Sequence, residues 1–367
     1  MNVRFDTHPS QHGKQIGLAT LDSPASLNAL SLPMIEALLD HLDRWAHDPT
    51  IVCVLLRATG DKAFCAGGDV RQLALACLDQ PGRVPPLAAR FFADEYRLDF
   101  RLHRFPKPLL CWGHGYVLGG GMGLLQAAGI RIVTPGSQLG MPEIGIGLYP
   151  DVGAGWFLPR LPGRMGLFLA LTGSRVNATD ALDLGLADRC LRDDQQPALL
   201  DGLAQINWDE QAPAQLNSLL KALELDAREA RPEALLASRR AVIDRDLDVA
   251  DLPAAWHAIA AWRNDQDAVL AQAAETLMAG CPLTAHLIWA QFRHCRYRSL
   301  AEILRLEYGM SLNCCRHPEF AEGVRGRLIE KRPPHWHWPT IDSVPTTVVD
   351  AHFEPSWDGP HPLADLV

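Results

Sequence analysis

The sequence of 367 residues has room for one large domain, or for a domain with a sizeable extension. It is 48% hydrophobic and 21% charged, the composition of an ordinary soluble globular protein. A core of this size needs no disulfide or metal to hold it together. The formal net charge of −9 argues against a protein that binds nucleic acid by electrostatic attraction.

Nine cysteines are present, and no two of them form a CxxC pair. Several stand in apolar runs, where a free thiol behaves as a small hydrophobic group, so the pattern indicates a reducing compartment. The first residues have neither the apolar stretch of a signal peptide nor the Arg and Ser content of a transit segment. The long apolar stretch at 108–133 contains seven glycines, which makes a membrane-spanning helix a poor interpretation. The sequence predicts a cytoplasmic protein that does not enter a membrane.

The first predicted elements alternate strand and helix. Strand-forming residues alternate at 16–20, after an extended stretch at 3–5, and together they predict an N-terminal hairpin. Ser31 has the position of an N-cap, and apolar residues at near-helical spacing extend the predicted helix to about residue 45. Branched apolar residues at 51–56 predict a buried strand.

The next elements continue this alternation. Strands are predicted at 108–112 and 130–133, and helices at about 87–103 and 121–128. Pairs of strands followed by a helix, repeated along the chain, predict an α/β spiral with its functional loops at strand ends.

Composition divides the chain into three regions. The α/β core is expected in residues 1–191, and from about Arg192 to residue 331 the sequence is almost wholly helical and rich in Ala and Leu. Within this second region, the capping box at 299–302 predicts a helix that ends near Asn313. Seven prolines in residues 332–367 predict a non-helical tail.

Two glycine clusters are candidate ligand sites: FCAGGD at 64–69 and GGGMG at 119–123, each between a strand and the start of a helix. Glycine lets a ligand atom approach the backbone, and amides at a helix start point outward without a partner in the helix. Two such donors on one oxygen form an oxyanion hole, often the largest electrostatic contribution in acyl chemistry. The alternative is a pair of turns in which glycine serves close packing.

Two carboxylates, Glu143 and Asp151, stand eight residues apart among apolar, Gly and Pro residues. Burial in such surroundings raises the pKa of a carboxyl group, whereas nearby donors lower it, and this tuning suits a base or a nucleophile. The alternative is structural: Glu143 caps a turn and Asp151 binds local amides.

Other motifs give no competing site. The glycine clusters match neither a Walker A motif nor a dinucleotide-binding fingerprint, and the chain has no GxSxG elbow and no HExxH. His335 and His337 suggest a metal, but two histidines in a Pro-rich tail are more typical of a surface. His114 follows an apolar strand and is predicted to be a hydrogen-bonded core histidine rather than a base.

Five phrases occur in an order and spacing that resemble the crotonase (enoyl-CoA hydratase/isomerase) superfamily. They are LNAL at 27–30, FCAGGD at 64–69, GYVLGGGMGL at 115–124, MPEIGIGLYPDVGAGWFLPRLPG at 141–163 and LTGSRVNATDALDLGLAD at 171–188. The PDVG phrase and the long helical region resemble, more narrowly, the 3-hydroxyisobutyryl-CoA hydrolase branch. The resemblance covers about residues 12–334 and implies a crotonase-like spiral of repeated ββα units with a C-terminal helical region.

The resemblance also assigns roles. It places the two oxyanion-hole amides at Gly68 and Gly120, the catalytic glutamate at Glu143, and the contact with the substrate's hydroxyacyl end at Asp151. Glu95 matches a glutamate that lines the acyl pocket. The implied reaction is hydrolysis of a branched 3-hydroxyacyl-CoA, most simply 3-hydroxyisobutyryl-CoA in valine breakdown, with Glu143 as nucleophile or as general base. Coenzyme A is then part of the substrate, and no metal or redox cofactor is needed.

Three matters stay open. The hydratases carry a second glutamate just after the triple glycine, and here that place is Gly123. With Glu143 as the single glutamate, hydration becomes harder. An isomerase can work with one glutamate and stays an alternative. A non-catalytic acyl-CoA-binding protein is a further alternative, but it would need neither Glu143 nor Asp151. The polyanionic coenzyme A calls for a local basic patch that the sequence does not locate, and the oligomeric state is open, a homo-oligomer included.

Overall fold

The computed structural model describes residues 2–367 and divides the chain into two units, each built from three separate segments. The first unit contains the chain up to Gly68 together with Leu98–Leu139 and Val176–Leu235. The second contains Asp69–Arg97, Gly140–Arg175 and Leu236–Val367. The expected division after residues 191 and 331 follows composition along the chain and stays a prediction.

Two sheets form the framework of the first unit. The larger sheet has the strand order β1-β2-β3-β5-β7-β9. Its strands are β1 (Val3–Pro9), β2 (Gln15–Leu21), β3 (Ile51–Ala58), β5 (Leu109–Gly113), β7 (Ile130–Val133) and β9 (Arg189–Cys190). The smaller sheet has the order β4-β6-β8, with β4 (Ala63–Cys65), β6 (Tyr116–Leu118) and β8 (Gln138–Gly140). Only β1 and β2 of the larger sheet pair antiparallel, so the predicted N-terminal hairpin is confirmed.

Successive strand pairs build the spiral. In the pairs β3–β4, β5–β6 and β7–β8, the first strand joins the larger sheet and the second joins the smaller sheet. Helix α2 (Val70–Asp79) follows the first pair and α4 (Gly120–Ala127) follows the second. The predicted repeat of two strands and a helix is therefore confirmed, and β4 and β6 run parallel, so their carboxyl ends lie at one edge of the smaller sheet.

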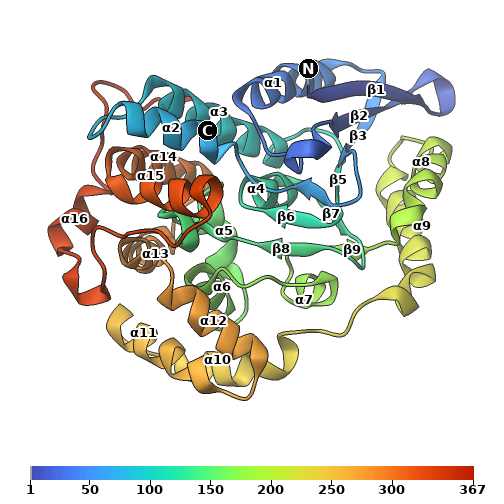
Figure 1. Ribbon diagram of the computed structural model, residues 1–367. Helices are drawn as coiled ribbons and strands as arrows, with labels where there is room; N and C mark the ends of the chain where they lie inside the picture. The colour runs from blue at the N-terminus through green and yellow to red at the C-terminus, as the bar shows by residue number, and fades with distance from the viewer. Residues whose placement is uncertain (1) are drawn as a thin grey trace. The chain divides into compact units, whose positions relative to one another are not determined.

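The core of the first unit lies between the larger sheet and two helices, α8 (Gln196–Gln205) and α9 (Ala212–Asp226), which Figure 1 shows beside the strands. Trp112 and the alternating apolar residues of β2, β3 and β5 pack there against leucines of both helices. Helix α1 (Leu32–His47) begins directly after Ser31, as predicted. Helix α7 (Ala178–Asp183) also belongs to the first unit.

The second unit is mainly helical, and α3 (Pro86–His103) passes from it into the first. Its other helices are α5 (Ala154–Phe157), α6 (Met165–Thr172), α10 (Arg240–Asp246), α11 (Leu252–Ala261), α12 (Ala268–Met278), α13 (Pro282–Cys295), α14 (Leu300–Arg316), α15 (Pro318–Val324) and α16 (Thr346–Ala351). The predicted capping box at the start of α14 is present, with Ser299 and Glu302 bonded to each other's backbone N–H. Among residues 2–367, no helix combines the length and the apolarity needed to cross a bilayer.

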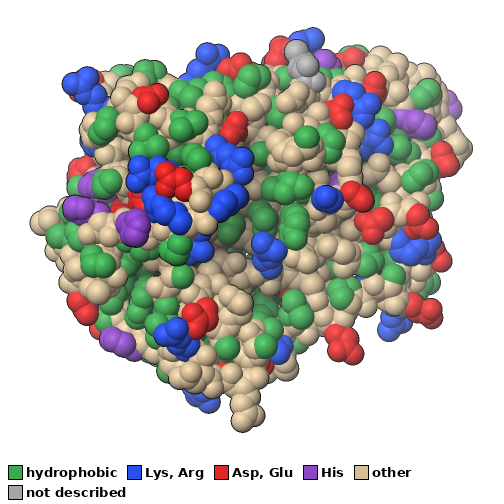
Figure 2. Space-filling view, viewed as in Figure 1, with side chains coloured by type: hydrophobic (Ala, Val, Ile, Leu, Met, Phe, Trp, Pro, Cys, Tyr) green, Lys and Arg blue, Asp and Glu red, His purple; other side chains and the backbone are tan. Residues whose placement is uncertain are grey.

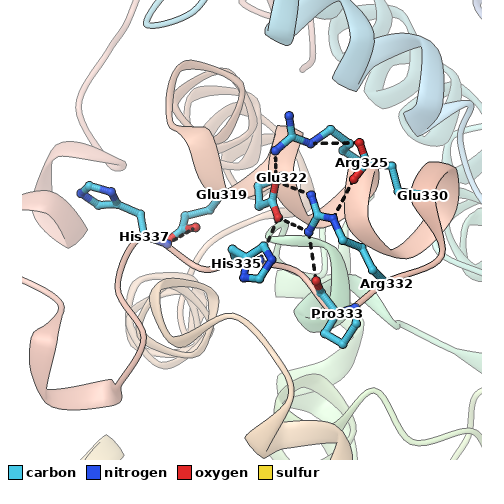
Figure 3. Close-up of polar contacts among 8 residues, drawn as sticks. All are labelled: Glu319, Glu322, Arg325, Glu330, Arg332, Pro333, His335 and His337. Carbon is cyan, nitrogen blue, oxygen red and sulfur yellow. Dashed lines mark hydrogen bonds and ion pairs between the residues drawn. The ribbon is translucent and has the colours of Figure 1, made fainter.

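The prediction of a non-helical tail after residue 332 is wrong for Thr346–Ala351, which forms α16. Proline is tolerated at the start of a helix, and Pro345 stands directly before α16. The tail is also anchored to α15, because the N–H groups of His335 and His337 donate to Glu322 and Glu319 (Figure 3). Proline content therefore excluded a long helix but not a short one between two prolines.

Candidate active site

Glu143 opens a short 3-10 turn, η3 (Glu143–Ile146), which packs tightly against α15. The turn ends at Gly147, whose φ of +72° favours glycine. A Cβ on Gly147 would lie 2.3 Å from the carbonyl oxygen of Glu319, and a Cβ on Gly323 would lie 2.3 Å from that of Ile146. Two glycines thus let the turn and the helix touch backbone to backbone, which gives the Glu143 side chain a rigid base.

The Glu143 carboxyl group is buried and short of partners. The residue is 5% exposed, and its Oε2 atom has no hydrogen-bond partner among residues 2–367. Burial raises the pKa of Glu143 well above its ordinary value, and the charge of Asp151 raises it further. Buried polar atoms are rarely left without a partner, so this oxygen is a place where a ligand or a reacting group would be stabilised.

Asp151 lies on a strained turn. The next two residues, Val152 and Gly153, have φ values of +52° and +83°. A β-branched residue such as Val152 rarely adopts a positive φ, and strain of this kind persists only where the surroundings enforce it. The turn leads directly into α5, where the N–H of Ala154 donates to the carbonyl of Asp151. The sequence PDVGAG therefore presents the Asp151 side chain at a sharp corner of the backbone.

The Asp151 carboxylate is held by a tyrosine that the sequence analysis did not single out. The hydroxyl of Tyr96, on α3, donates to Oδ2 of Asp151 at 2.6 Å. Asp151 is 4% exposed, and burial raises its pKa to about 6 although the Tyr96 hydroxyl acts in the opposite direction. Glu95, the preceding residue of α3, is also buried.

Glu307, on α14, clamps the turn that carries Asp151. Its Oε2 accepts from the N–H of Gly153 at 2.7 Å, and its Oε1 accepts from the N–H of Gly155 at 2.9 Å and from Nε2 of Gln291 at 3.1 Å. Glu307 is fully buried, and burial raises its pKa to about 8 against these three donors. These bonds oppose the strain at Val152, because both glycine amides are tied to one side chain.

The two glycine amides predicted to bind an oxyanion follow adjacent strands of the first unit. Gly68 comes three residues after β4, and Gly120 is the first residue of α4, two residues after β6. Since β4 and β6 are parallel neighbours, both amides follow the same edge of the smaller sheet. In residues 2–367, neither N–H donates a backbone hydrogen bond. The end of β4 and the first turn of α4 also touch, since a Cβ on Gly121 would lie 2.3 Å from the carbonyl oxygen of Cys65.

The predicted residues fall into two groups. Glu143, Asp151 and Glu95 belong to the second unit, and Gly68 and Gly120 belong to the first. Sequence reasoning missed the supporting residues, which are Tyr96, Tyr149, Gln291, Glu307 and Ser311. The last two could have been found, because they stand four residues apart on the otherwise apolar face of α14.

The other candidates have structural surroundings. Nε2 of His114 lies 2.8 Å from the carbonyl oxygen of Gly60, as expected of a hydrogen-bonded core histidine. His335 and His337 use their backbone N–H groups to hold the tail. Within the described part of the chain, no group of three or more His, Cys, Asp or Glu side chains is arranged to hold a metal ion. All nine cysteines are buried and free.

A cluster of charged side chains gathers over α15, where Figure 2 shows basic groups around acidic ones. Arg332 contacts Glu322 at 2.6 Å and Glu330 at 2.6 Å, and Arg325 contacts Glu322 at 2.5 Å (Figure 3). Because these arginines are paired with carboxylates, much of their charge is neutralised locally. The cluster therefore does not by itself meet the expectation of a basic patch for coenzyme A.

Comparisons with known proteins identify the family of the chain. The sequence pattern of the enoyl-CoA hydratase/isomerase family matches residues 16–353. The chain is 34% identical to the mitochondrial 3-hydroxyisobutyryl-CoA hydrolase of Danio rerio, over 92% of this chain and 86% of that protein. It is 32% identical to the protein of the same name from Xenopus tropicalis, over 96% and 91%. Among solved structures it is similar to a carnitinyl-CoA dehydratase from Mycobacterium thermoresistibile, with a TM-score of 0.83, 29% identity and 96% of each chain covered.

Proposed function

The chain belongs to the enoyl-CoA hydratase/isomerase family, and we propose that it is a thioester hydrolase that acts on 3-hydroxyisobutyryl-CoA. Two relatives that bear the name of this hydrolase are similar to the chain over more than nine-tenths of its length. The reaction would place the protein in valine degradation.

One observation carries the proposal: the buried Glu143 carboxyl group has an oxygen without a partner, beside a second buried carboxyl group, Asp151. Two buried acids whose charges repel each other cost folding free energy, so a protein that needed them only for structure would gain by replacing one. An enzyme that needs a nucleophile or base next to a hydroxyl-binding group would keep both.

In the proposed reaction, the N–H groups of Gly68 and Gly120 donate to the thioester oxygen and stabilise its developing negative charge. The Glu143 carboxylate attacks the carbonyl carbon, the C–S bond breaks, and coenzyme A leaves as a thiolate that takes up a proton. Water then hydrolyses the mixed anhydride, which releases the hydroxy acid and restores Glu143. In the alternative route, Glu143 removes a proton from the water that attacks the thioester directly. Two observations support these roles. Among residues 2–367, the N–H groups of Gly68 and Gly120 donate no backbone hydrogen bond, and the turn at Glu143 is rigid.

Asp151 would accept a hydrogen bond from the 3-hydroxyl group of the substrate, and Glu95 would shape the same end of the acyl pocket. Asp151 is suited to this role, because Tyr96 and the backbone turn hold its position. No metal or redox group enters these steps, since coenzyme A is the leaving group of the substrate.

A hydratase or isomerase on the same scaffold is the second candidate function. The similarity to a carnitinyl-CoA dehydratase supports this alternative. Adding or removing water across a double bond needs an acid and a base on the same water. The position at which hydratases carry their second glutamate is Gly123, a buried residue in the first turn of α4. A protein that only binds acyl-CoA would have no use for the partnerless oxygen of Glu143.

The experiment that separates these functions measures two products at once. The protein is mixed with 3-hydroxyisobutyryl-CoA, isobutyryl-CoA and crotonyl-CoA, and free thiol is followed together with the absorbance of the conjugated double bond. We expect thiol from 3-hydroxyisobutyryl-CoA, and little thiol from isobutyryl-CoA, because the analogue leaves Asp151 without its donor. Loss of the double bond without any thiol would establish the hydratase instead.

The role of Asp151 is tested with the same two saturated esters. Asp151→Ala is expected to reduce the preference for 3-hydroxyisobutyryl-CoA, chiefly by slowing that substrate. Asp180→Ala is the matched control, since Asp180 is another buried aspartate, but it accepts from backbone N–H groups around α7 and should leave the preference unchanged. Equal hydrolysis of both esters by the unmodified protein would remove Asp151 from the proposal and leave Glu143 in it.

A further inference from the structure

Three buried hydroxyl groups form a continuous chain from Asp151 to the backbone of α14. The Tyr96 hydroxyl lies 2.6 Å from Oδ2 of Asp151 and 2.7 Å from Oγ of Ser311. Oγ of Ser311 lies 2.9 Å from the hydroxyl of Tyr149, which in turn lies 2.6 Å from the carbonyl oxygen of Glu307. None of the three hydroxyl-bearing side chains is exposed. This hydroxyl chain therefore has four contacts of hydrogen-bond length, and each of these contacts needs one proton.

The direction of every bond follows from the end at α14. The Glu307 carbonyl can only accept, so the Tyr149 proton points to it. The contact between Tyr149 and Ser311 must then use the Ser311 proton, so the contact between Ser311 and Tyr96 can be made only with the Tyr96 proton, which an ionised Asp151 takes for its own hydrogen bond. Only a proton on Oδ2 of Asp151 is left for the fourth contact. Three hydroxyl protons thus satisfy three contacts, and the set is complete only when Asp151 is protonated.

We propose that Ser311 and Tyr149 are positioning residues that act through Tyr96 to favour the protonated form of Asp151. When Asp151 ionises, one of the four contacts loses its proton, which costs about one hydrogen bond in a buried site. An ionised Asp151 is the stronger acceptor for a substrate hydroxyl. The preference for a 3-hydroxyacyl group should therefore increase as Asp151 loses its proton. This consequence rests on the proposed function, whereas the effect on Asp151 itself does not.

Acidic and neutral side chains on several elements interact electrostatically with Asp151. From η3, α3, α14 and its own turn these are Glu143, Tyr96, Glu307, Cys314, Cys315 and Tyr149. Burial raises the pKa of both tyrosines and both cysteines well above their ordinary values, so these side chains are neutral near pH 7. Replacing either tyrosine by phenylalanine consequently removes a hydroxyl group and no charge.

Three substitutions distinguish an effect of the hydroxyl chain from a general loss of packing. They should move the pH midpoint for ionisation of Asp151 in opposite directions. Tyr96→Phe removes the direct donor to the carboxylate, so the midpoint should rise. Ser311→Ala frees the Tyr96 proton for Asp151, and Tyr149→Phe frees the Ser311 proton for Tyr96, so both should lower the midpoint. Each shift should be roughly 0.5 to 1 pH unit, the size expected for one hydrogen bond.

The decisive measurement follows the Asp151 carboxyl group itself, in the substrate-free protein, by infrared difference spectroscopy across pH. Subtracting the spectrum of Asp151→Asn isolates its signal. Opposite shifts in Tyr96→Phe and Tyr149→Phe support the proposal, and each of these changes keeps the ring in place. Shifts in the same direction, or an unchanged midpoint in Tyr149→Phe and Ser311→Ala, would overturn it.

A second measurement uses the ratio of kcat/KM for 3-hydroxyisobutyryl-CoA to that for isobutyryl-CoA, taken across pH. The midpoint of this ratio should move with the infrared midpoint in each variant. Opposite infrared shifts together with a ratio that does not depend on pH would leave the hydroxyl chain in place and contradict the proposed contact between Asp151 and the substrate. The two proposals therefore fail in different ways.

Discussion

Oε2 of Glu307 accepts a 2.7 Å hydrogen bond from the N–H of Gly153, two residues after Asp151. This bond joins the middle of α14 to the most strained part of the candidate site, where Val152 has a positive φ. A helix from the C-terminal part of the chain thereby determines the geometry of a turn that lies about 150 residues earlier.

The buried carboxyl group of Glu307 should make the stability of the protein depend on pH. Its folded-state pKa of about 8 lies above the value of about 4.3 expected in the unfolded chain. Between these values the folded state keeps a proton that the unfolded state has lost. The contribution of Glu307 to the free energy of unfolding is therefore greatest at low pH and is lost as pH rises through about 8. Asp151 acts in the same sense, but only up to about pH 6. We expect Tm to fall between about pH 6 and pH 8, and to fall less in Glu307→Gln.

The matched control for this measurement is Glu302→Gln, which lies on the same helix. Glu302 caps the start of α14, and its bonds to Ser299 lower its pKa, so this variant should keep the full decline in Tm. Glu143, whose pKa is also raised, should preserve part of the decline in Glu307→Gln. An equal decline in both variants would remove Glu307 as its source.

Glu143→Gln keeps the size of the side chain and removes its ability to attack or to accept a proton. Turnover of 3-hydroxyisobutyryl-CoA should fall by roughly a hundredfold or more, while a non-hydrolysable acyl-CoA analogue should bind with nearly unchanged affinity. In the unmodified protein, kcat/KM should increase with pH, because burial and the charge of Asp151 keep Glu143 protonated to higher pH than usual. Near-normal release of thiol by Glu143→Gln would exclude the residue from the reaction.

Gly68→Val tests the proposed amide donor, because it places a branched side chain beside the N–H group. Gly68 is only partly buried and has no positive φ, so the backbone can accept valine. Loss of one oxyanion donor costs about 3 kcal/mol in the transition state, which corresponds to a loss in kcat of roughly a hundredfold. Gly136→Val is the control, since Gly136 is exposed and a Cβ there meets no atom within 4 Å. Equal activity of the two folded variants would argue against a role for Gly68.

Local sequence determined much of the fold and singled out the candidate site residues. The strand at 51–56, the helix after Ser31 and the capping box at Ser299 all depend on nearest neighbours in the chain, and all three are present. The predicted site residues could be named because their motifs are short and continuous. The short helix α16 was missed because proline content says where a helix cannot continue, not whether one can begin.

Tertiary structure alone decided how the site is supported. Tyr96 and Ser311 are 215 residues apart, and nothing in either local sequence indicates that their hydroxyl groups meet beside Asp151. Glu307 could be recognised from sequence as a charge on an apolar helix face, but its three donors come from two other segments. Hydrogen bonds between distant segments depend on packing geometry, and the raised pKa values of Glu143, Asp151 and Glu307 depend on burial. Both are properties of the folded chain, because burial and long-range contacts exist only once the segments have packed together.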